Sequence, residues 1–173
     1  PELEHVQAEL TAGRLPQWNP YARFGAALLA TSVVGLLYPP HWLTLLALDP
    51  AHGLAFTAYL ALVIAGVAMF GFLRARHLSP MVALFGAVAF AYSGSLSANL
   101  HFYQRMHALV WLPGALWALT RMHQRRGAAR WRAGVGLSLC LAMSWLAGFP
   151  AFAAPVTLVS AVYALWLALG HAR

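Results

Sequence analysis

The chain has 173 residues, of which 61% are hydrophobic and only 9% are charged. An average globular protein has roughly 45–50% apolar and about 25% charged residues, so this composition excludes a disordered chain, a collagen-like repeat and an ordinary soluble enzyme. The mean hydropathy of +0.66 indicates an integral membrane protein.

The charged residues are few and unevenly placed. All eleven basic residues are arginines, and the four acids are Glu2, Glu4, Glu9 and Asp49, which gives a net charge of +7. The arginines stand between long apolar runs, so we interpret them as signals of membrane topology and expect no nucleic-acid partner. The single cysteine, Cys140, leaves no intrachain disulfide and no Cys-x-x-Cys pair.

Residues 1–49 are predicted to form a loop region on the outer side of the membrane. Leu3, Val6 and Leu10 share one face of a short amphipathic helix over the first thirteen residues, and Gly13 is its predicted C-cap. The two prolines and the asparagine that follow in 15–21 predict an ordered turn.

The segment 24–48 is apolar but is interrupted by Tyr38-Pro39-Pro40-His41. We expect a re-entrant or interfacial piece, because the parts before and after the prolines are each poor membrane spans. The alternative is one crossing, which would move the N-terminus to the inner side.

Residues 50–173 are predicted to form a transmembrane bundle of about five helices. Uncharged runs of sufficient length occur from Gly53 to Leu73 and from Pro80 to Leu100, and the last uncharged stretch, 133–170, is long enough for two crossings. The expected helices are 53–73, 80–100, 102–120, 133–149 and 151–170.

The arginines orient this bundle. Eight of the eleven lie at 74–76, at 121–132 and at 173. The other three are Arg14, Arg23 and Arg105. If the eight are cytoplasmic, as the positive-inside rule favours, the N-terminal segment and the loop at 99–106 lie outside. We therefore expect a multi-pass membrane protein with its N-terminal segment on the outer side.

An ordered set of short motifs resembles the YfhO-type bacterial membrane protein family. The motifs, in chain order, are Leu15-Pro16-Gln17-Trp18-Asn19-Pro20-Tyr21, Phe24-Gly25, Tyr38-Pro39-Pro40, Phe72-Leu73-Arg74, Ala89-Phe90-Ala91-Tyr92-Ser93-Gly94, Trp111-Leu112-Pro113 and Leu146-Ala147-Gly148-Phe149-Pro150. The resemblance covers nearly the whole chain.

This resemblance implies an all-α, GT-C-like glycosyltransferase that is a multi-pass protein of a bacterial cytoplasmic (inner) membrane. Such a protein uses a polyprenyl-phosphate-linked sugar on the outer face to modify a cell-surface glycan or polymer, and a divalent metal is compatible with that class. The first transmembrane helix and the catalytic acid expected after it would precede Pro1, so we expect the chain to be a fragment. At the Gly148 turn the family tends to have Gly-His-Pro-Gln, whereas this chain has Phe149 and Ala151.

Sugar transfer from a lipid phosphate needs a cation for the departing phosphate and a base for the acceptor hydroxyl. Arg105 is the predicted phosphate ligand, and the alternative is an arginine that snorkels to lipid headgroups. The flanking His101 and His107 are candidate donors to a sugar or phosphate. Their separation of six residues and the lack of a nearby carboxylate argue against a metal site.

Two other groups have a structural and a functional interpretation. Trp18, Asn19 and Tyr21 would form a sugar platform or a turn anchored at the membrane interface. Asp49 precedes Pro50 and is favoured as a helix N-cap over a catalytic or metal ligand.

Three functional classes remain open from the sequence. The first is the glycosyltransferase, acting on membrane lipids and a glycan acceptor. The second is a non-catalytic membrane scaffold. The third is a lipid or glycan transporter, which is disfavoured because Asp, Glu and Arg avoid the centres of the predicted spans.

Overall fold

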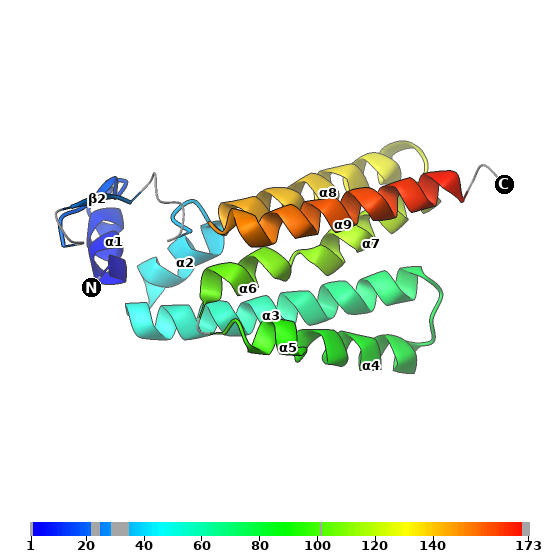
Figure 1. Cartoon of the computed structure of the whole chain (residues 1–173), viewed down its shortest axis with the longest axis horizontal. Helices are drawn as coiled ribbons and strands as arrows, with labels where there is room; N and C mark the ends of the chain where they lie inside the picture. Colours follow the sequence, from blue (N-terminus) through cyan, green and yellow to red (C-terminus); the bar gives the residue numbers. More distant parts are fainter. Residues whose placement is uncertain (1, 22–24, 29–34, 101, 171–173) are drawn as a thin grey trace.

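A computed structural model of the chain describes all residues except 1, 22–24, 29–34, 101 and 171–173. The described part is mostly helical (Figure 1). The helices are α1 (Glu2–Thr11), α2 (Pro39–Ala47), α3 (Pro50–Ala75), α4 (Pro80–Ala91), α5 (Gly94–Ser97), α6 (Tyr103–Leu109), α7 (Leu112–Gln124), α8 (Gly127–Leu146) and α9 (Pro150–Leu169). Two short strands, β1 (Trp18–Asn19) and β2 (Ala26–Ala27), pair antiparallel.

The N-terminal region forms a small cap beyond one end of the helical bundle (Figure 1). The predicted amphipathic helix is α1, and its buried Val6 packs with Leu28 and Leu36 in a small apolar cluster. Gly13 has a positive φ of 71° directly after α1, as the C-cap prediction required. The predicted turn contains β1. In the segment 24–48, expected to be re-entrant or interfacial, residues 24 and 29–34 fall outside the described residues, and the last part forms α2.

The long helices run back and forth along one axis, so their connections gather at two ends (Figure 1). At one end, next to α1 and α2, lie the α5–α6 and α8–α9 connections; we call this the cap end. At the other end lie the α3–α4 and α7–α8 connections, which carry Arg76, Arg125 and Arg126, and Arg74 lies in the last turn of α3; we call this the arginine-rich end.

Helix starts follow simple local chemistry. Ser79 caps α4 by accepting a hydrogen bond from the Val82 amide, and Pro80 occupies the first turn, where its missing N–H costs nothing. The α8–α9 turn is made by Gly148 at φ 89°, followed by Pro150 at the start of α9.

Two of the expected continuous helices are interrupted. The segment expected at 80–100 is divided into α4 and α5 near Ser93, and the segment expected at 102–120 is divided into α6 and α7 at Val110–Trp111. Pro113 accounts for the second break, because it cannot donate the helical hydrogen bond to Leu109. The helix expected at 133 begins at Gly127 and therefore includes the exposed Arg130 and Arg132.

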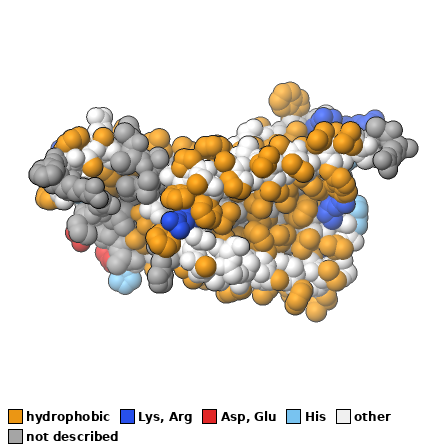
Figure 2. All heavy atoms as spheres, viewed as in Figure 1, with side chains coloured by type: hydrophobic (Ala, Val, Ile, Leu, Met, Phe, Trp, Pro, Cys, Tyr) orange, Lys and Arg blue, Asp and Glu red, His pale blue; other side chains and the backbone are white. Residues whose placement is uncertain are grey.

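Three helical segments of the described residues are long and apolar enough to cross a membrane: His52–Ala75, Pro80–Ser97 and Pro150–Leu169. Their buried faces are rich in alanine, as in Ala61 and Ala65 of α3 and Ala83 and Ala87 of α4, which lets helices approach closely. Large apolar side chains such as Phe85 and Leu165 point outward, and Figure 2 shows hydrophobic side chains along the bundle. This pattern fits a bundle surrounded by lipid.

Candidate functional site

The candidate site lies at the cap end of the bundle, where α6 meets α2 and the start of α9. Helix α6 has only seven residues but carries three side chains of interest on different faces. Tyr103 and His107 are four residues apart and share one face, whereas Arg105 projects from another. The buried Ser144 of α8 donates a hydrogen bond to the carbonyl of Ala108 at 2.8 Å and fastens α6 to the bundle.

Arg105 lies among phenylalanine rings. Its guanidinium carbon is 4.1 Å from the ring centre of Phe102, 4.9 Å from that of Phe149 and 5.9 Å from that of Phe152. These distances are typical of cation–π contacts. We call this group the Arg105 site.

The Nε atom of Arg105 is buried and has no hydrogen-bond partner among the described residues. A buried donor without an acceptor costs about 1–3 kcal/mol, and more when the group is charged. The phenylalanine rings attract the cation through their faces but offer no acceptor oxygen. The Arg105 site is therefore chemically suited to an oxyanion that has an apolar part.

His107 lies inside the protein and pairs with a histidine from another helix. Its Nδ1 is 3.1 Å from Nε2 of His41, and its own Nε2 is 3.4 Å from the carbonyl oxygen of Thr57. His41 is 3% exposed and His107 is 0% exposed. We call His41 and His107 the histidine pair; it joins α2, α3 and α6 and is not presented at the surface.

Aromatic rings surround the histidine pair. Tyr38 stacks on His107 at a centroid distance of 5.1 Å and contacts His41 edge-on at 5.0 Å. Its hydroxyl accepts a 3.1 Å hydrogen bond from the indole nitrogen of Trp111. Burial raises the pKa of Tyr38 to about 12 and lowers the pKa of His41 to about 4, so both side chains are neutral near pH 7.

The three residues of the candidate sugar platform lie in and directly after β1: Trp18 and Asn19 form the strand, and Tyr21 follows it. Asn19 is 1% exposed, and its Oδ1 accepts a hydrogen bond from the backbone amide of Tyr21. Trp18 and Tyr21 are 55% and 74% exposed. His5 of α1 joins them, since its Nε2 is 2.9 Å from the Trp18 carbonyl. Asn19 thus holds the turn, while the two aromatic rings remain exposed.

Two of the acids are engaged locally. Asp49 accepts a hydrogen bond from the His52 amide and also contacts the His52 ring, so it caps α3 as expected. Glu9 forms a two-point ion pair with Arg14, which lowers the pKa of its carboxyl group. These contacts are structural and lie outside α6.

His101 lies outside the described residues. In the part of the chain that the structure describes, no three His, Cys, Asp or Glu side chains come together in a way that would hold a metal ion.

Several site residues had no signal in the sequence. His41 is 66 positions from His107, and only the packing of α2 against α3 and α6 brings the two together. Phe149 and Phe152 are three residues apart at the start of α9, which is a sequence signal for one helical face but not for a contact with Arg105. In the sequence, Phe149 stands out only as a departure from the family pattern at the Gly148 turn.

Comparison of the chain with family models, with curated proteins and with solved structures gives no match. The fold and site therefore define the class on their own evidence. The protein is a helical bundle with three helical segments of membrane-spanning length and apolarity, and it has a partly exposed cation–aromatic cluster at one end.

Proposed function

We propose that this protein is a membrane-embedded, GT-C-like glycosyltransferase in which Arg105 binds the phosphate of a polyprenyl-phosphate-linked sugar. One observation carries the proposal: a guanidinium that lies within 6 Å of three phenylalanine ring centres has a buried Nε without an acceptor among the described residues. A lipid phosphate supplies oxyanions for the cation and an apolar chain for the rings. Arginine is well suited to this role because its planar fork binds phosphate at two points.

The position of the Arg105 site supports a lipid-linked ligand. Phe102 is 50% exposed, and α9 begins directly beside Arg105 with an apolar sequence of membrane-spanning length. A ligand at the head of such a helix would keep its chain in the lipid and its polar group at the interface. The exposed rings of Trp18 and Tyr21, also at this end, would offer stacking surfaces for the sugar or glycan.

In this proposal Arg105 stabilises the phosphate as the bond to the sugar breaks. The acceptor hydroxyl also needs a base. Glu9 is held by Arg14 and Asp49 by the first turn of α3, so neither is assigned that role. The Arg105 site therefore accounts for binding of the donor phosphate.

The second candidate is a non-catalytic membrane scaffold. It is favoured by the histidine pair, whose nitrogens satisfy each other and the Thr57 carbonyl. Such a saturated buried network fixes the packing of helices without needing a ligand.

Binding of polyprenyl phosphate to the purified full chain in detergent tests the proposal. Arg105→Gln removes the charge but keeps polar donors, and we expect its affinity to fall by 10- to 100-fold, as for loss of a charged hydrogen bond of roughly 1.5–3 kcal/mol. Arg14→Gln removes an arginine that is already paired with Glu9 and should bind like the parent protein. Equal affinity of Arg105→Gln and the parent would reject the phosphate role.

Transfer activity separates the two candidates. Membranes that contain the full-length protein should transfer sugar from a polyprenyl-phosphate donor to glycan, and Arg105→Gln should reduce this transfer at least tenfold while the protein still inserts. Lipid-phosphate binding without any transfer would instead support the scaffold.

A further inference from the structure

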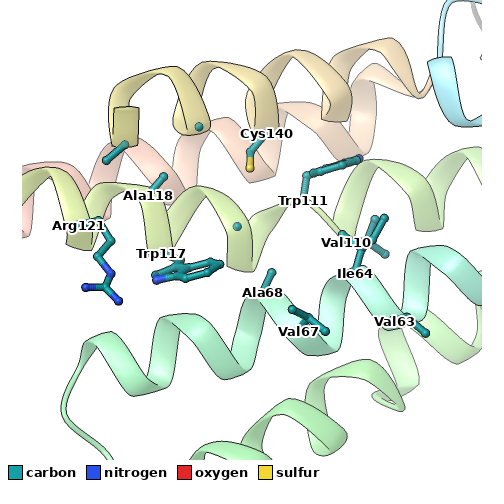
Figure 3. A pocket seen from close by; sticks show the side chains of 13 residues that line it. Val63, Ile64, Val67, Ala68, Val110, Trp111, Trp117, Ala118, Arg121 and Cys140 are labelled. Carbon is teal, nitrogen blue, oxygen red and sulfur yellow. The ribbon is translucent and has the colours of Figure 1, made fainter. Parts of the chain in front are cut away.

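A second unassigned feature lies toward the opposite end of the bundle. Helices α3, α7 and α8 enclose an open groove of about 490 Å³, whose walls are almost entirely apolar (Figure 3). Its lining includes Val63, Val67, Trp111, Ala118 and Cys140. The volume lies within the range of small-molecule sites.

Small residues keep this groove open. Gly114 of α7 faces Cys140 of α8, and a Cβ atom at Gly114 would come within 2.8 Å of the cysteine sulfur. Gly136 of α8 has more room, because its Cβ would meet only Ala118 at 4.0 Å. A longer side chain at Gly136 would therefore enter the groove rather than push the helices apart.

The groove ends at two hydrogen-bond donors. Arg121 lines it near the end of α7, and in Figure 3 the nitrogen-bearing side of the Trp117 ring points toward Arg121. The Trp117 Nε1 is buried and has no partner among the described residues. Trp117 cannot easily turn away, because its ring lies against Gly71 of α3, where a Cβ would approach within 2.8 Å.

We propose that this groove binds one acyl chain of an anionic phospholipid from the leaflet at the arginine-rich end, with the lipid phosphate on Arg121. Trp117 Nε1 donates to a phosphate or ester oxygen of the same lipid. The apolar walls suit the chain, and the two converging donors suit the headgroup. This site is separate from the Arg105 site and does not depend on the proposed transferase activity.

Charge favours a lipid over a second copy of this chain. All four acids, Glu2, Glu4, Glu9 and Asp49, precede α3 in the chain and lie near the cap end. A second copy lying parallel in the membrane would bring more arginine, not a carboxylate, to Arg121. An anionic lipid headgroup supplies the missing negative charge, and neighbouring arginines of the α7–α8 connection add to the attraction.

The test measures binding of phosphatidylglycerol and of zwitterionic phosphatidylcholine to the delipidated full chain by native mass spectrometry. We expect retention of phosphatidylglycerol at least tenfold above phosphatidylcholine. Arg121→Gln should remove this preference. Arg132→Gln, which removes an exposed arginine outside the groove, should keep it.

A second variant pair tests the groove itself. Gly136→Leu should fill the groove and lower phosphatidylglycerol retention at least fivefold, whereas Ala128→Leu, at an exposed position at the start of α8, should not. Circular dichroism checks that both variants keep their helix content.

Alkylation of Cys140 measures occupancy of the groove without any substitution in it. Cys140 is the single cysteine and lines the groove, so phosphatidylglycerol should slow its alkylation by a membrane-permeant maleimide severalfold. The proposal would be overturned if phosphatidylglycerol did not change the alkylation rate of Cys140. It would also be overturned if Arg121→Gln and Arg132→Gln lost phosphatidylglycerol binding equally. Cross-linking of Cys140 in one copy to Cys140 in another copy, without retained lipid, would also overturn it.

Discussion

His41 and His107 share a hydrogen bond inside the protein, and in that bond one ring nitrogen donates while the other accepts. Burial lowers the pKa of His41 from 6.5 to about 4. The neutral form of His41 is therefore the one that fits the folded state. Tyr38, Tyr103 and His107 surround it, and none of them supplies a negative charge near pH 7 that would compensate a proton.

This pKa shift predicts acid sensitivity. Between pH 6.5 and about 4 the unfolded chain binds a proton on His41 that the folded chain does not, so the free energy of unfolding decreases as the pH falls. The shift corresponds to on the order of 3 kcal/mol in total. Thermal unfolding in detergent at a series of pH values measures it. His41→Gln should reduce the change of the free energy of unfolding with pH, and the exposed His77→Gln should leave that change as it is in the parent. The same pH dependence in all three proteins would contradict the prediction.

At the scale of elements, one glycine on α3 decides how closely α7 packs. Gly71 lies against the Trp117 ring, where an added Cβ would come within 2.8 Å. Gly66, five residues earlier on the same helix, would place its Cβ at an ordinary 3.7 Å from Ala91 of α4. Both residues are glycines with the same helix propensity, but an added Cβ fits at Gly66 and is too close to a neighbour at Gly71. The two positions therefore form a matched pair.

Alanine substitution separates the two effects. Gly66→Ala should leave stability unchanged or raise it by up to about 1 kcal/mol, because alanine favours the helix. Gly71→Ala should lower stability by about 1–2 kcal/mol, since overpacking against a large ring costs more than the helix gains. Thermal unfolding of the two variants beside the parent measures the difference. A gain in stability for Gly71→Ala would show that Trp117 moves freely.

For the whole molecule, the back-and-forth path places Trp18 at the cap end and Arg125 at the arginine-rich end (Figure 1). If the bundle spans a membrane, these two positions face different compartments. The positive-inside rule assigns the arginine-rich end to the cytoplasm.

Cysteine labelling tests this arrangement in intact cells. In a Cys140→Ala background, an impermeant maleimide should label Trp18→Cys, and it should label Arg125→Cys only after the membrane is opened. Position 140 faces the apolar groove, so its removal leaves both ends intact. Labelling of both positions from the same side would contradict the proposed topology.

Much of the fold follows from local patterns. The apolar runs predicted long helices, Asp49 and Pro50 predicted the start of α3, and Gly13 predicted the end of α1. The arginines predicted which connections share one end of the bundle. These features depend on chain length, hydropathy and capping, which neighbouring residues determine.

Only the tertiary structure determined which side chains meet at each site. His107 reads in the sequence as a candidate ligand donor, but its nitrogens face His41 and Thr57, which are 66 and 50 positions away. Arg105 acquires its phenylalanine surroundings because α9 begins beside α6. The groove at Arg121 exists because glycines and alanines of three helices face one another. Hydropathy determines that a helix is buried in lipid or protein, whereas side-chain shape determines which helices meet and what remains open between them.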